Sequence, residues 1–310
     1  MEYRELGKTG LRLSSISLGA SSLGAVFRDI DEPEGIRTVH AAIANGINFI
    51  DVSPYYGFTK AEILLGKALK TIPRDKYFLS TKIGRYGIDG VKSWDYSAAR
   101  AEQSIEESMK RLNVDYIDIL HVHDIEFSDL NQVIQETIPA LLKIKKKGKV
   151  GHIGITGLPL EKHKYIIENL PAGTIDAILS FCHFCLNDDS LNDHVPFFLK
   201  NETGIINASP LSMGLLTSRG APAWHPASEK LRKLCAKAAL LCADAGYPIE
   251  QLAVSFSVSN TAITTTLVST ASSENILRNI EWSGMPLNTQ LLSEVQELLK
   301  PVFRETWENS

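Results

Sequence analysis

Residues 115–123 read DYIDILHVH, a short run of apolar and β-branched side chains between two polar segments. Such a run predicts a buried strand, here Tyr116–His123. The stretch before it, Ala98–Leu112, carries apolar residues at helical spacing, and so does the stretch after it, Leu130–Lys147. A helix, a buried strand and a second helix in succession are typical of βα units around a parallel sheet.

This unit recurs along the whole chain of 310 residues. Seven more strands are predicted, at Ile16–Ala20, Ile47–Ser53, Tyr77–Ile83, His152–Gly157, Ala177–Cys182, Gly204–Ser209 and Thr265–Thr270. Further helices are predicted at Pro33–Asn45 and Ile249–Ser259. Eight βα repeats in about 300 residues favour a TIM barrel over an open doubly wound sheet. The dinucleotide fingerprint GxGxxG is also absent, since Gly19 and Gly24 have the wrong spacing.

We therefore expect an α/β fold with a single (β/α)8 barrel domain over residues 1–310, preceded by an N-terminal β-hairpin. No Pro-, Gly- or Ser-rich linker divides the chain. The segments 220–228 and 290–307 are additional to the eight units, and we expect them to form a loop and a C-terminal helix that cap the barrel.

Composition narrows the functional classes. The chain has 32 basic and 36 acidic side chains and a formal net charge of −4, and its Lys and Arg are scattered apart from a cluster at 143–149. This distribution gives no electrostatic signal for binding nucleic acid or an anionic membrane. No apolar run approaches the roughly 20 residues that span a bilayer. We expect a cytoplasmic protein with reduced thiols, and we interpret Cys182 and Cys185, which form a CxxC motif, as structural residues.

Four polar side chains fall at or just after the carboxyl ends of predicted strands. They are Asp51 in the second strand, Tyr56 after it, Lys82 in the third and His123 in the fourth. The active site of a TIM barrel lies at this face. A buried Lys needs a nearby anion, and Asp51 is the candidate because neighbouring strands lie about 5 Å apart. An acid, a phenol, an ammonium and an imidazole at one rim predict an acid/base site.

The residues around these four positions resemble the aldo-keto reductases. The resemblance rests on the runs 48–57 (NFIDVSPYYG), 80–82 (STK), 115–123 (DYIDILHVH), 148–150 (GKV), 153–155 (IGI), 209–211 (SPL) and 214–217 (GLLT). It follows the chain in order from Leu6 to about Asn279. A barrel fold and a nicotinamide-dependent oxidoreductase activity are what this resemblance implies.

The resemblance also implies roles for the four rim residues. Tyr56 exchanges a proton with the substrate oxygen while a hydride passes between the substrate carbon and the nicotinamide. A free phenol has a pKa of about 10, and Lys82 is expected to lower it by roughly 3 units. Asp51 keeps Lys82 charged, and His123 binds and orients the substrate oxygen. His121 points to the same side one layer deeper, and we expect it to serve in packing.

A nicotinamide cofactor is the next implication. By alignment with the family, the residues expected to hold it are Gly19, Ala20, Asp51, Thr156, Ser180, Ser209, Leu211, Gly214, Ser272, Asn275 and Asn279. Members that prefer NADP place a Lys and an Arg after the eighth strand, where this chain has Ser269 and Asn275. Since a 2′-phosphate needs fixed cations, we predict NAD as the cofactor. Arg278 is the one basic residue close enough in sequence to change this preference.

Three positions depart from the common family pattern. Thr156-Gly157 replaces a Ser-Asn pair, Ser180 replaces a Gln, and Ala208 replaces an aromatic residue that stacks on the nicotinamide. Hydroxyl groups can take over the first two hydrogen-bonding roles, whereas Ala208 cannot stack. We consider Phe184 as another ring that could cover the nicotinamide.

The substrate is expected to be a small sugar. Four stretches, 123–127, 136–141, 154–160 and 224–228, resemble a subgroup of aldose dehydrogenases, which implies oxidation of an L-galactose-like aldose at C1 to its lactone. The residues themselves indicate a small polar polyol, through Trp94, Asp124 and Trp224 on predicted rim loops. An NAD(P)H-dependent reductase of small aldehydes or ketones is the alternative that uses the same four residues.

Two other classes are open at this point. His121 and His123 form an HxH pair at a strand end, as in metal-dependent hydrolases of this architecture. His183 is a candidate third ligand, while His152 begins its strand and belongs to the opposite face. A non-catalytic accessory subunit, such as some proteins of this family form with ion channels, would be expected to show an exposed apolar stripe, which the sequence does not indicate.

Overall fold

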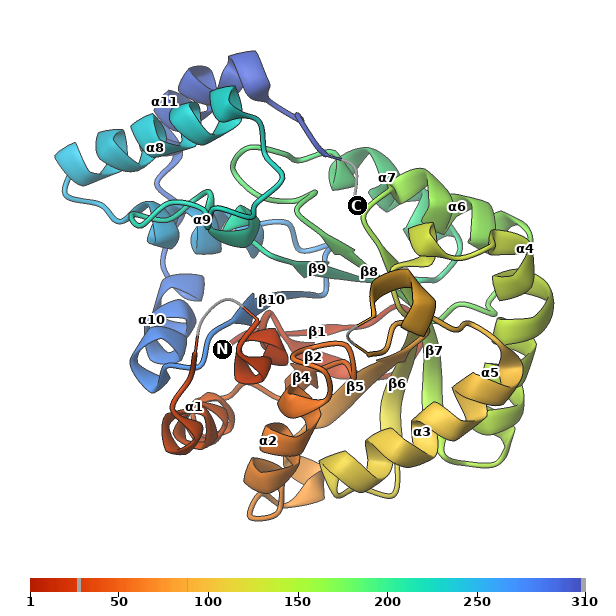
Figure 1. Cartoon of the computed structure of the whole chain (residues 1–310). Coiled ribbons are helices and arrows are strands. Elements are labelled where there is room, and N and C mark those ends of the chain that lie inside the picture. The colour runs from red at the N-terminus through yellow and green to blue at the C-terminus, as the bar shows by residue number, and fades with distance from the viewer. Residues whose placement is uncertain (27–28, 88, 308–310) are drawn as a thin grey trace.

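Eight parallel strands close into a barrel in the computed structural model, which describes residues 1–26, 29–87 and 89–307 (Figure 1). The strands are β3 (Ile16–Gly19), β4 (Phe49–Asp51), β5 (Phe78–Ile83), β6 (Ile117–Val122), β7 (Val150–Gly157), β8 (Ala177–Phe181), β9 (Gly204–Ala208) and β10 (Thr265–Ser269). They pair in chain order, and β10 closes the ring on β3. The predicted barrel is confirmed, and each predicted strand overlaps one of these eight.

Helices form the outer layer of the barrel. They are α1 (Glu32–Ala44), α2 (Lys60–Leu69), α3 (Ala98–Leu112), α4 (Leu130–Gln132), α5 (Ile138–Lys146), α6 (Leu160–Glu168), α7 (Leu191–Lys200), α8 (Glu229–Asp244), α9 (Ile249–Ser257), α10 (Ser273–Ser283) and α11 (Thr289–Leu299). Ser97 caps the first turn of α3 and Asn113 ends the helix in the left-handed conformation, so the predicted bounds of α3 hold at both ends.

The predicted helix 130–147 is interrupted near its start. A π-helical turn, Val133–Thr137, joins α4 to α5, and Pro139 lies in the first turn of α5. Proline lacks the N–H that a continuous α-helix would use, so the hydrogen-bond pattern shifts at this point. The hydroxyl of Thr137 donates to the carbonyl of Tyr96 at 2.5 Å and ties this turn to the segment before α3.

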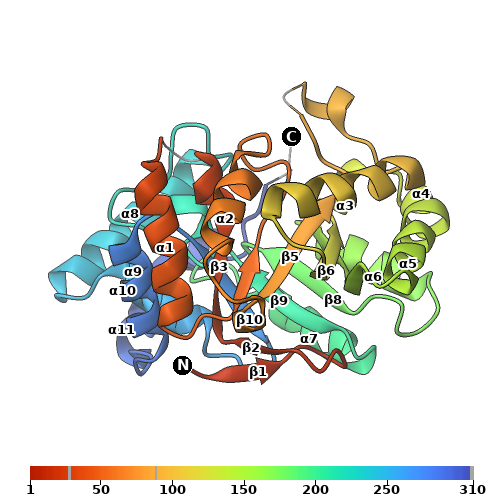
Figure 2. The same cartoon turned by 90° about the horizontal axis from the view of Figure 1, so that it is seen from below.

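The expected N-terminal hairpin closes the amino-terminal end of the barrel. Strands β1 (Tyr3–Glu5) and β2 (Arg12–Ser14) pair antiparallel below the barrel, at the end opposite the chain's C-terminus (Figure 2). Leu6 and Leu13 are fully buried and pack with Phe49, Ile119 and Ile206 from the barrel strands. Because this end is filled with apolar side chains, a ligand can enter only from the carboxyl ends of the strands.

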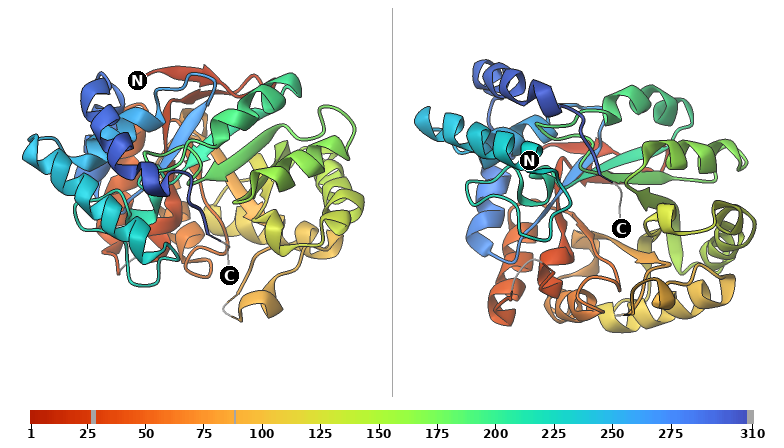
Figure 3. Two further views of the ribbon diagram at one scale, coloured as in Figure 1. Left: turned by 90° about the horizontal axis from the view of Figure 1, so that it is seen from above. Right: turned by 45° about the horizontal axis from the view of Figure 1, so that its top comes forward.

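The two additional segments take different places. The predicted C-terminal helix extends the outer layer and does not cap the barrel, whereas the loop 220–228 reaches the carboxyl ends of the strands through Trp224. Helix α11 packs against α8, and the cyan and blue helices of residues 229–299 lie together on one side of the barrel (Figure 3). Beyond α11 the chain returns to the loop 220–228, where the ring of Trp307 meets the ring of His225 edge-on. Among the described residues, no helix has the length and apolar character needed to cross a membrane.

A buried carboxylate fixes the strand that carries Lys82. Glu62 on α2 is fully buried, and its two oxygens accept from Thr81 of β5 at 2.7 Å and from Arg111 of α3 at 2.6 Å. The Arg111 side chain remains 19% exposed, so it supplies the countercharge from the edge of the core. This link holds β5 and two helices in one arrangement directly behind the strand's inward-facing residues.

We expect Arg111→Met to lower the free energy of unfolding by about 3 kcal/mol, because it leaves a buried carboxylate without its cation. Urea unfolding followed by circular dichroism measures the change. The double variant Glu62→Gln/Arg111→Met is the control, since a neutral amide needs no countercharge and should regain part of the loss. A single variant as stable as the unmodified protein would show that the ion pair contributes nothing.

Candidate active site

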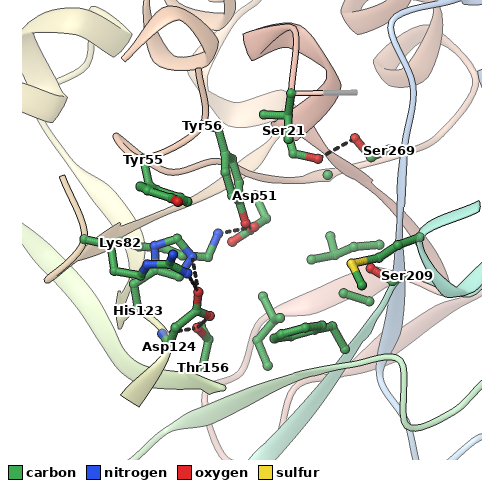
Figure 4. Close-up of a pocket in the computed structure, with 18 of the residues that line it drawn as sticks. Ser21, Asp51, Tyr55, Tyr56, Lys82, His123, Asp124, Thr156, Ser209 and Ser269 are labelled. Carbon is green, nitrogen blue, oxygen red and sulfur yellow. Dashed lines mark hydrogen bonds and ion pairs between the residues drawn. The ribbon is translucent and has the colours of Figure 1, made fainter. Parts of the chain in front are cut away.

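A cavity of about 340 Å³ opens at the carboxyl ends of the barrel strands. Figure 4 shows Tyr56, Lys82 and His123 on one side of it and Ser21, Ser209 and Ser269 on the other. All four rim residues predicted from the sequence, Asp51, Tyr56, Lys82 and His123, line this cavity. The barrel therefore brings together side chains from four separate positions in the chain, and their catalytic roles remain a prediction.

Lys82 and Asp51 form a buried ion pair. Both side chains are at most 3% exposed, and the Lys82 ammonium binds Asp51 Oδ1 and donates to the carbonyl of Val52 at 2.9 Å. Ser80 donates to the other oxygen of Asp51 at 2.6 Å. Burial acts to lower the pKa of Lys82, but Asp51 and Tyr56 together outweigh it, with Asp51 first, and the pKa is raised. Lys82 is thus a fixed positive charge at the base of the cavity.

Tyr56 stands next to this charge. The Lys82 ammonium lies 4.7 Å from the centre of the Tyr56 ring. Burial raises the pKa of the Tyr56 phenol, and the Lys82 charge acts in the opposite direction without overcoming it. The expectation that Lys82 lowers the pKa of this phenol below its usual value is therefore corrected, because the sequence shows the neighbouring charge but not the degree of burial.

His123 lies beside Tyr56 on the same side of the cavity (Figure 4). Their rings meet edge-on with centres 5.7 Å apart, and His123 Nε2 lies 3.5 Å from a carboxylate oxygen of Asp124. Burial, Lys82 and Arg85 lower the pKa of His123 well below its usual range, so the imidazole is neutral. His121 lies one layer deeper beside Gly154, where a Cβ would overlap the His121 ring, so the expected packing role fits its position.

A second charged pair lies at the mouth of the cavity. Arg85 follows β5, pairs with Asp124 and stacks against three aromatic rings, Tyr55 at 4.0 Å, Trp94 at 4.3 Å and Phe127 at 4.6 Å. Asp124 is held in turn by Thr156, whose hydroxyl accepts from its backbone N–H at 2.9 Å. Asp124 and the exposed Trp224 line the cavity as the sequence indicated. Arg85, Tyr55 and Phe127 also line it, and none of them was predicted as a site residue because each lies outside the barrel strands.

The residues predicted to hold a cofactor fall into two groups. Gly19, Asp51, Thr156 and Ser209 line the cavity. Ser180 does not, because side chains alternate along a strand and its neighbours Leu179 and Phe181 are the ones that face the cavity. The Ser180 hydroxyl is buried and has no hydrogen-bond partner within the described ranges. The expected contact from Ser180 is thus replaced by an apolar surface.

The remaining predicted cofactor residues lie beside the cavity. Ala20 begins the turn after β3, and Leu211 and Gly214 belong to the turn after β9. Ser272 caps α10 by accepting from the backbone N–H of Asn275, and Asn279 is buried further along this helix. These elements follow β3, β9 and β10, which are neighbours in the barrel, so they lie at the same end.

The wall opposite Tyr56 is apolar. Ala208 pairs with Phe181 in the strand register, and Leu179, Phe181, Met213 and Leu267 line the cavity around it. Phe184, the ring considered from the sequence, is buried elsewhere and stacks on Phe256 with ring centres 4.8 Å apart. Phe181 is therefore the aromatic ring that stands next to Ala208.

The cysteines and the additional histidines have ordinary structural surroundings. Cys182 and Cys185 are buried free thiols, and burial raises the pKa of Cys182 to about 12. His183 contacts the carbonyl of Leu158 at 2.7 Å and Ser190 at 2.9 Å, so both of its ring nitrogens are engaged. Across the described part of the chain, no three His, Cys, Asp or Glu side chains come together as metal ligands would. The metal-ligand set that a metal-dependent hydrolase would need therefore does not form among these residues.

Comparison with known proteins identifies the family. The model of the "Aldo/keto reductase family" matches residues 15–300. The chain belongs to the aldo/keto reductase family. L-galactose dehydrogenase of Arabidopsis thaliana is 46% identical over 99% of this chain and 97% of its own length. D-arabinose 1-dehydrogenase of Saccharomyces cerevisiae is 33% identical over 80% of this chain and 76% of its own length.

The solved structures support the fold. The aldo-keto reductase AKR11C1 from Bacillus halodurans, in its holo form, superposes with a TM-score of 0.79 and covers 100% of this chain and 99% of its own, at 23% identity. The family resemblance expected from the sequence is thus confirmed. This aldo/keto reductase is an oxidoreductase, and enzymes of its family use nicotinamide cofactors.

The residues of the cavity fit a nicotinamide. A flat ring would lie against the apolar wall formed by Phe181, Ala208 and Leu267, facing Tyr56 across the cavity. Gly19 has no side chain, so the backbone of β3 is open to a ligand at this point. The hydroxyls of Ser209 and Ser269 continue from this wall toward α10 and supply neutral donors for the polar remainder of a dinucleotide.

Proposed function

We propose that this aldo/keto reductase oxidises an aldose at C1 to the lactone with NAD, and that Tyr56, Lys82, Asp51 and His123 carry the acid/base chemistry. The observation that carries the proposal is the buried Lys82–Asp51 pair beside the phenol of Tyr56 at the wall of the cavity. A structural ion pair would need no titratable phenol or imidazole at the same place.

The reaction separates into a proton and a hydride. The sugar hydroxyl at C1 gives its proton to the Tyr56 oxygen, and His123 donates a hydrogen bond to the sugar oxygen and orients it. When bound, a nicotinamide cofactor would supply the acceptor for the hydride of C1. Lys82 stabilises the phenolate form of Tyr56, and Asp51 holds Lys82 in place. A C=O bond forms at C1 as its C–H and O–H bonds break.

The shape and polarity of the cavity mouth support a sugar substrate. Arg85 and Asp124 place a cation and an anion next to His123, within a frame of aromatic rings. Vicinal hydroxyls can donate to a carboxylate and accept from a guanidinium, and aromatic rings cover the apolar face of a sugar. The 46% identity with the L-galactose dehydrogenase of Arabidopsis thaliana favours an L-galactose-like aldose.

The surroundings of α10 support NAD over NADP. The hydroxyl of Ser269 is bound by Ser21 and Ser22, at 2.8 Å each. Glu34 accepts from the backbone N–H and the hydroxyl of Ser273, both at 2.7 Å, which lowers the pKa of Glu34 to about 2. A carboxylate thus already occupies the first turn of α10, where a 2′-phosphate would be repelled.

Arg278 does not supply the missing cation. Its guanidinium binds Glu274, one turn earlier on the exposed face of α10. Because the positive charge of Arg278 is paired with Glu274 of the same helix, Arg278 is not available as a cation for a 2′-phosphate.

Reduction of small aldehydes or ketones is the second candidate, and one observation favours it. The raised pKa of Tyr56, caused by burial, keeps the phenol protonated, which is the state that an acid in carbonyl reduction requires. Initial rates in both directions, with a panel of L- and D-aldoses and simple aldehydes, decide between the two activities. Faster turnover of every aldehyde than of any aldose would favour the reductase.

Replacing Tyr56 by Phe removes one oxygen, and we expect turnover of the aldose to fall about a thousandfold. NAD binding, measured by isothermal titration calorimetry, should persist because the ring still fills its place. In the unmodified enzyme the oxidation rate should still be rising at about pH 9 without a plateau, because burial raises the pKa of Tyr56 and the phenol must lose its proton to act as the base. Substantial activity in Tyr56→Phe would show that the proton goes elsewhere.

The cofactor prediction is tested by comparing kcat/KM for the two cofactors. NAD should exceed NADP by about tenfold or more, because residues 268–277, at and after the end of the eighth strand, contain no Lys or Arg that could bind the 2′-phosphate. The double variant Ser269→Lys/Asn275→Arg should move the ratio toward NADP, and Ser269→Gln/Asn275→Gln is the uncharged control of similar length. Equal use of both cofactors by the unmodified enzyme would contradict the prediction.

Asp124→Asn tests recognition of the sugar. It keeps the shape of the side chain and removes its charge, so kcat/KM for aldoses should fall about tenfold relative to that for a small aldehyde without hydroxyls. The ratio is the measured quantity because the charge of Asp124 also acts on Tyr56. Asp95→Asn, at an exposed carboxylate outside the cavity, is the control. An unchanged ratio would remove Asp124 from substrate recognition.

A further inference from the structure

Ser53 is a buried residue next to His123 that has no role in the proposed reaction. It follows β4 by two residues, and its side chain is fully buried. Its Oγ lies 3.1 Å from His123 Nδ1, the ring nitrogen that does not face Asp124. Ser53 therefore binds one ring nitrogen of His123, while the other ring nitrogen lies near the carboxylate of Asp124.

The direction of this hydrogen bond follows from the other bond that Ser53 makes. The same Oγ accepts from the backbone N–H of Tyr55 at 3.1 Å. A hydroxyl has one hydrogen and two acceptor lone pairs, so Ser53 can accept from Tyr55 and still donate its own hydrogen to another group. Within the described structure, His123 Nδ1 is the one acceptor in reach of it. If Nδ1 carried a proton instead, the hydroxyl hydrogen would be buried without an acceptor, which is costly.

The other ring nitrogen has the complementary surroundings. His123 Nε2 lies 3.5 Å from Asp124 Oδ2, an oxygen that can only accept while the carboxylate is ionised. A proton on Nε2 is therefore favoured from this side as well. Because the ring is neutral, it holds a single N–H, and its two tautomers present either a donor or a lone pair to the cavity.

We propose that Ser53 is a positioning residue that fixes His123 as the Nε2–H tautomer, so that the imidazole presents a hydrogen-bond donor to the substrate oxygen. The proposal extends the function proposed above, in which His123 acts on that oxygen. A donor stabilises negative charge that develops on the oxygen as its proton leaves. A lone pair at the same place would repel that charge, so the wrong tautomer would slow the reaction without changing the shape of the cavity.

The bond also fixes the orientation of the ring. His123 meets the rings of Tyr55 and Tyr56 edge-on, with centres 6.0 Å and 5.7 Å away, and these contacts alone do not distinguish the ring from its flip by half a turn about the Cβ–Cγ bond. The flip exchanges Nδ1 with Cδ2 and Nε2 with Cε1, so it would place a carbon beside Ser53 and lose the hydrogen bond. Ser53 thus distinguishes two orientations that packing does not.

Nuclear magnetic resonance of the free enzyme tests the tautomer directly. The protein is labelled with 15N in its histidine rings, and the signals of His123 are assigned by their loss in His123→Gln. We expect Nε2 to give the shift of a protonated nitrogen and Nδ1 that of an unprotonated one. Ser53→Ala should give a mixture of tautomers, and Ser53→Thr, which retains the hydroxyl, should restore the single form.

Two results would overturn the proposal. The first is a proton on Nδ1 in the unmodified enzyme, and this spectrum decides even if Ser53→Thr does not fold. The second is a single Nε2–H tautomer in Ser53→Ala, because Asp124 alone would then be sufficient. Ser257→Ala, which removes another fully buried hydroxyl outside the cavity, is the matched control and should leave the His123 signals unchanged.

Kinetic measurements distinguish the proposed role of Ser53 from the proposed enzymatic function on which it rests. We expect Ser53→Ala to lower kcat about 10- to 100-fold with a smaller change in KM for NAD, and Ser53→Thr to recover most of the loss. Loss of tautomer order without loss of rate would mean that the donor at Nε2 has no role in turnover. If Tyr56→Phe remains active while the tautomer result holds, the proposed reaction fails and the structural role of Ser53 stands.

Discussion

The buried ammonium of Lys82 is the constraint on which the active-site cavity depends. A charge that is 1% exposed is stable only where anions and carbonyl oxygens replace water, and Asp51 and Val52 supply them. Ser80 in turn binds the second oxygen of Asp51. Lys82 and Ser80 belong to β5, whereas Asp51 belongs to β4 and Val52 follows it, so these contacts also hold β4 and β5 in one register.

The barrel register explains why these groups meet at one place. Asp51 pairs with Ser80 and Lys82 pairs with His121, so inward-facing side chains of successive strands lie at matching heights. Below them, Leu6 and Leu13 of the hairpin fill the interior with apolar groups. The low dielectric beneath the cavity strengthens the charges above it, which is why burial is the largest influence on the pKa of Tyr56 and of His123.

Sequence patterns were sufficient for the fold and for part of the site. Short apolar runs that alternate with helical stretches along the chain located all eight strands. The rule that barrel sites lie at strand ends led to Asp51, Tyr56, Lys82 and His123. Ser180, named as a cofactor contact by alignment with the family, does not line the cavity, because strand register decides which side chains of β8 face inward and one sequence does not reveal it. Arg85 was missed because it lies on a loop whose path only the folded chain defines.

The pair at the cavity mouth acts on the acid/base groups as well as on whatever binds there. The charge of Asp124 raises the pKa of Tyr56, and the charge of Arg85 lowers the pKa of His123. Each effect favours the neutral form of the group it acts on. Asp124 and Arg85 thus help to keep the Tyr56 phenol and the His123 imidazole uncharged beside the Lys82–Asp51 ion pair. A hydroxyl that engages the Asp124 carboxylate spreads its negative charge and weakens its hold on the Tyr56 proton. In the function proposed above, recognition of a polyol and ionisation of the phenol would therefore be coupled through one carboxylate.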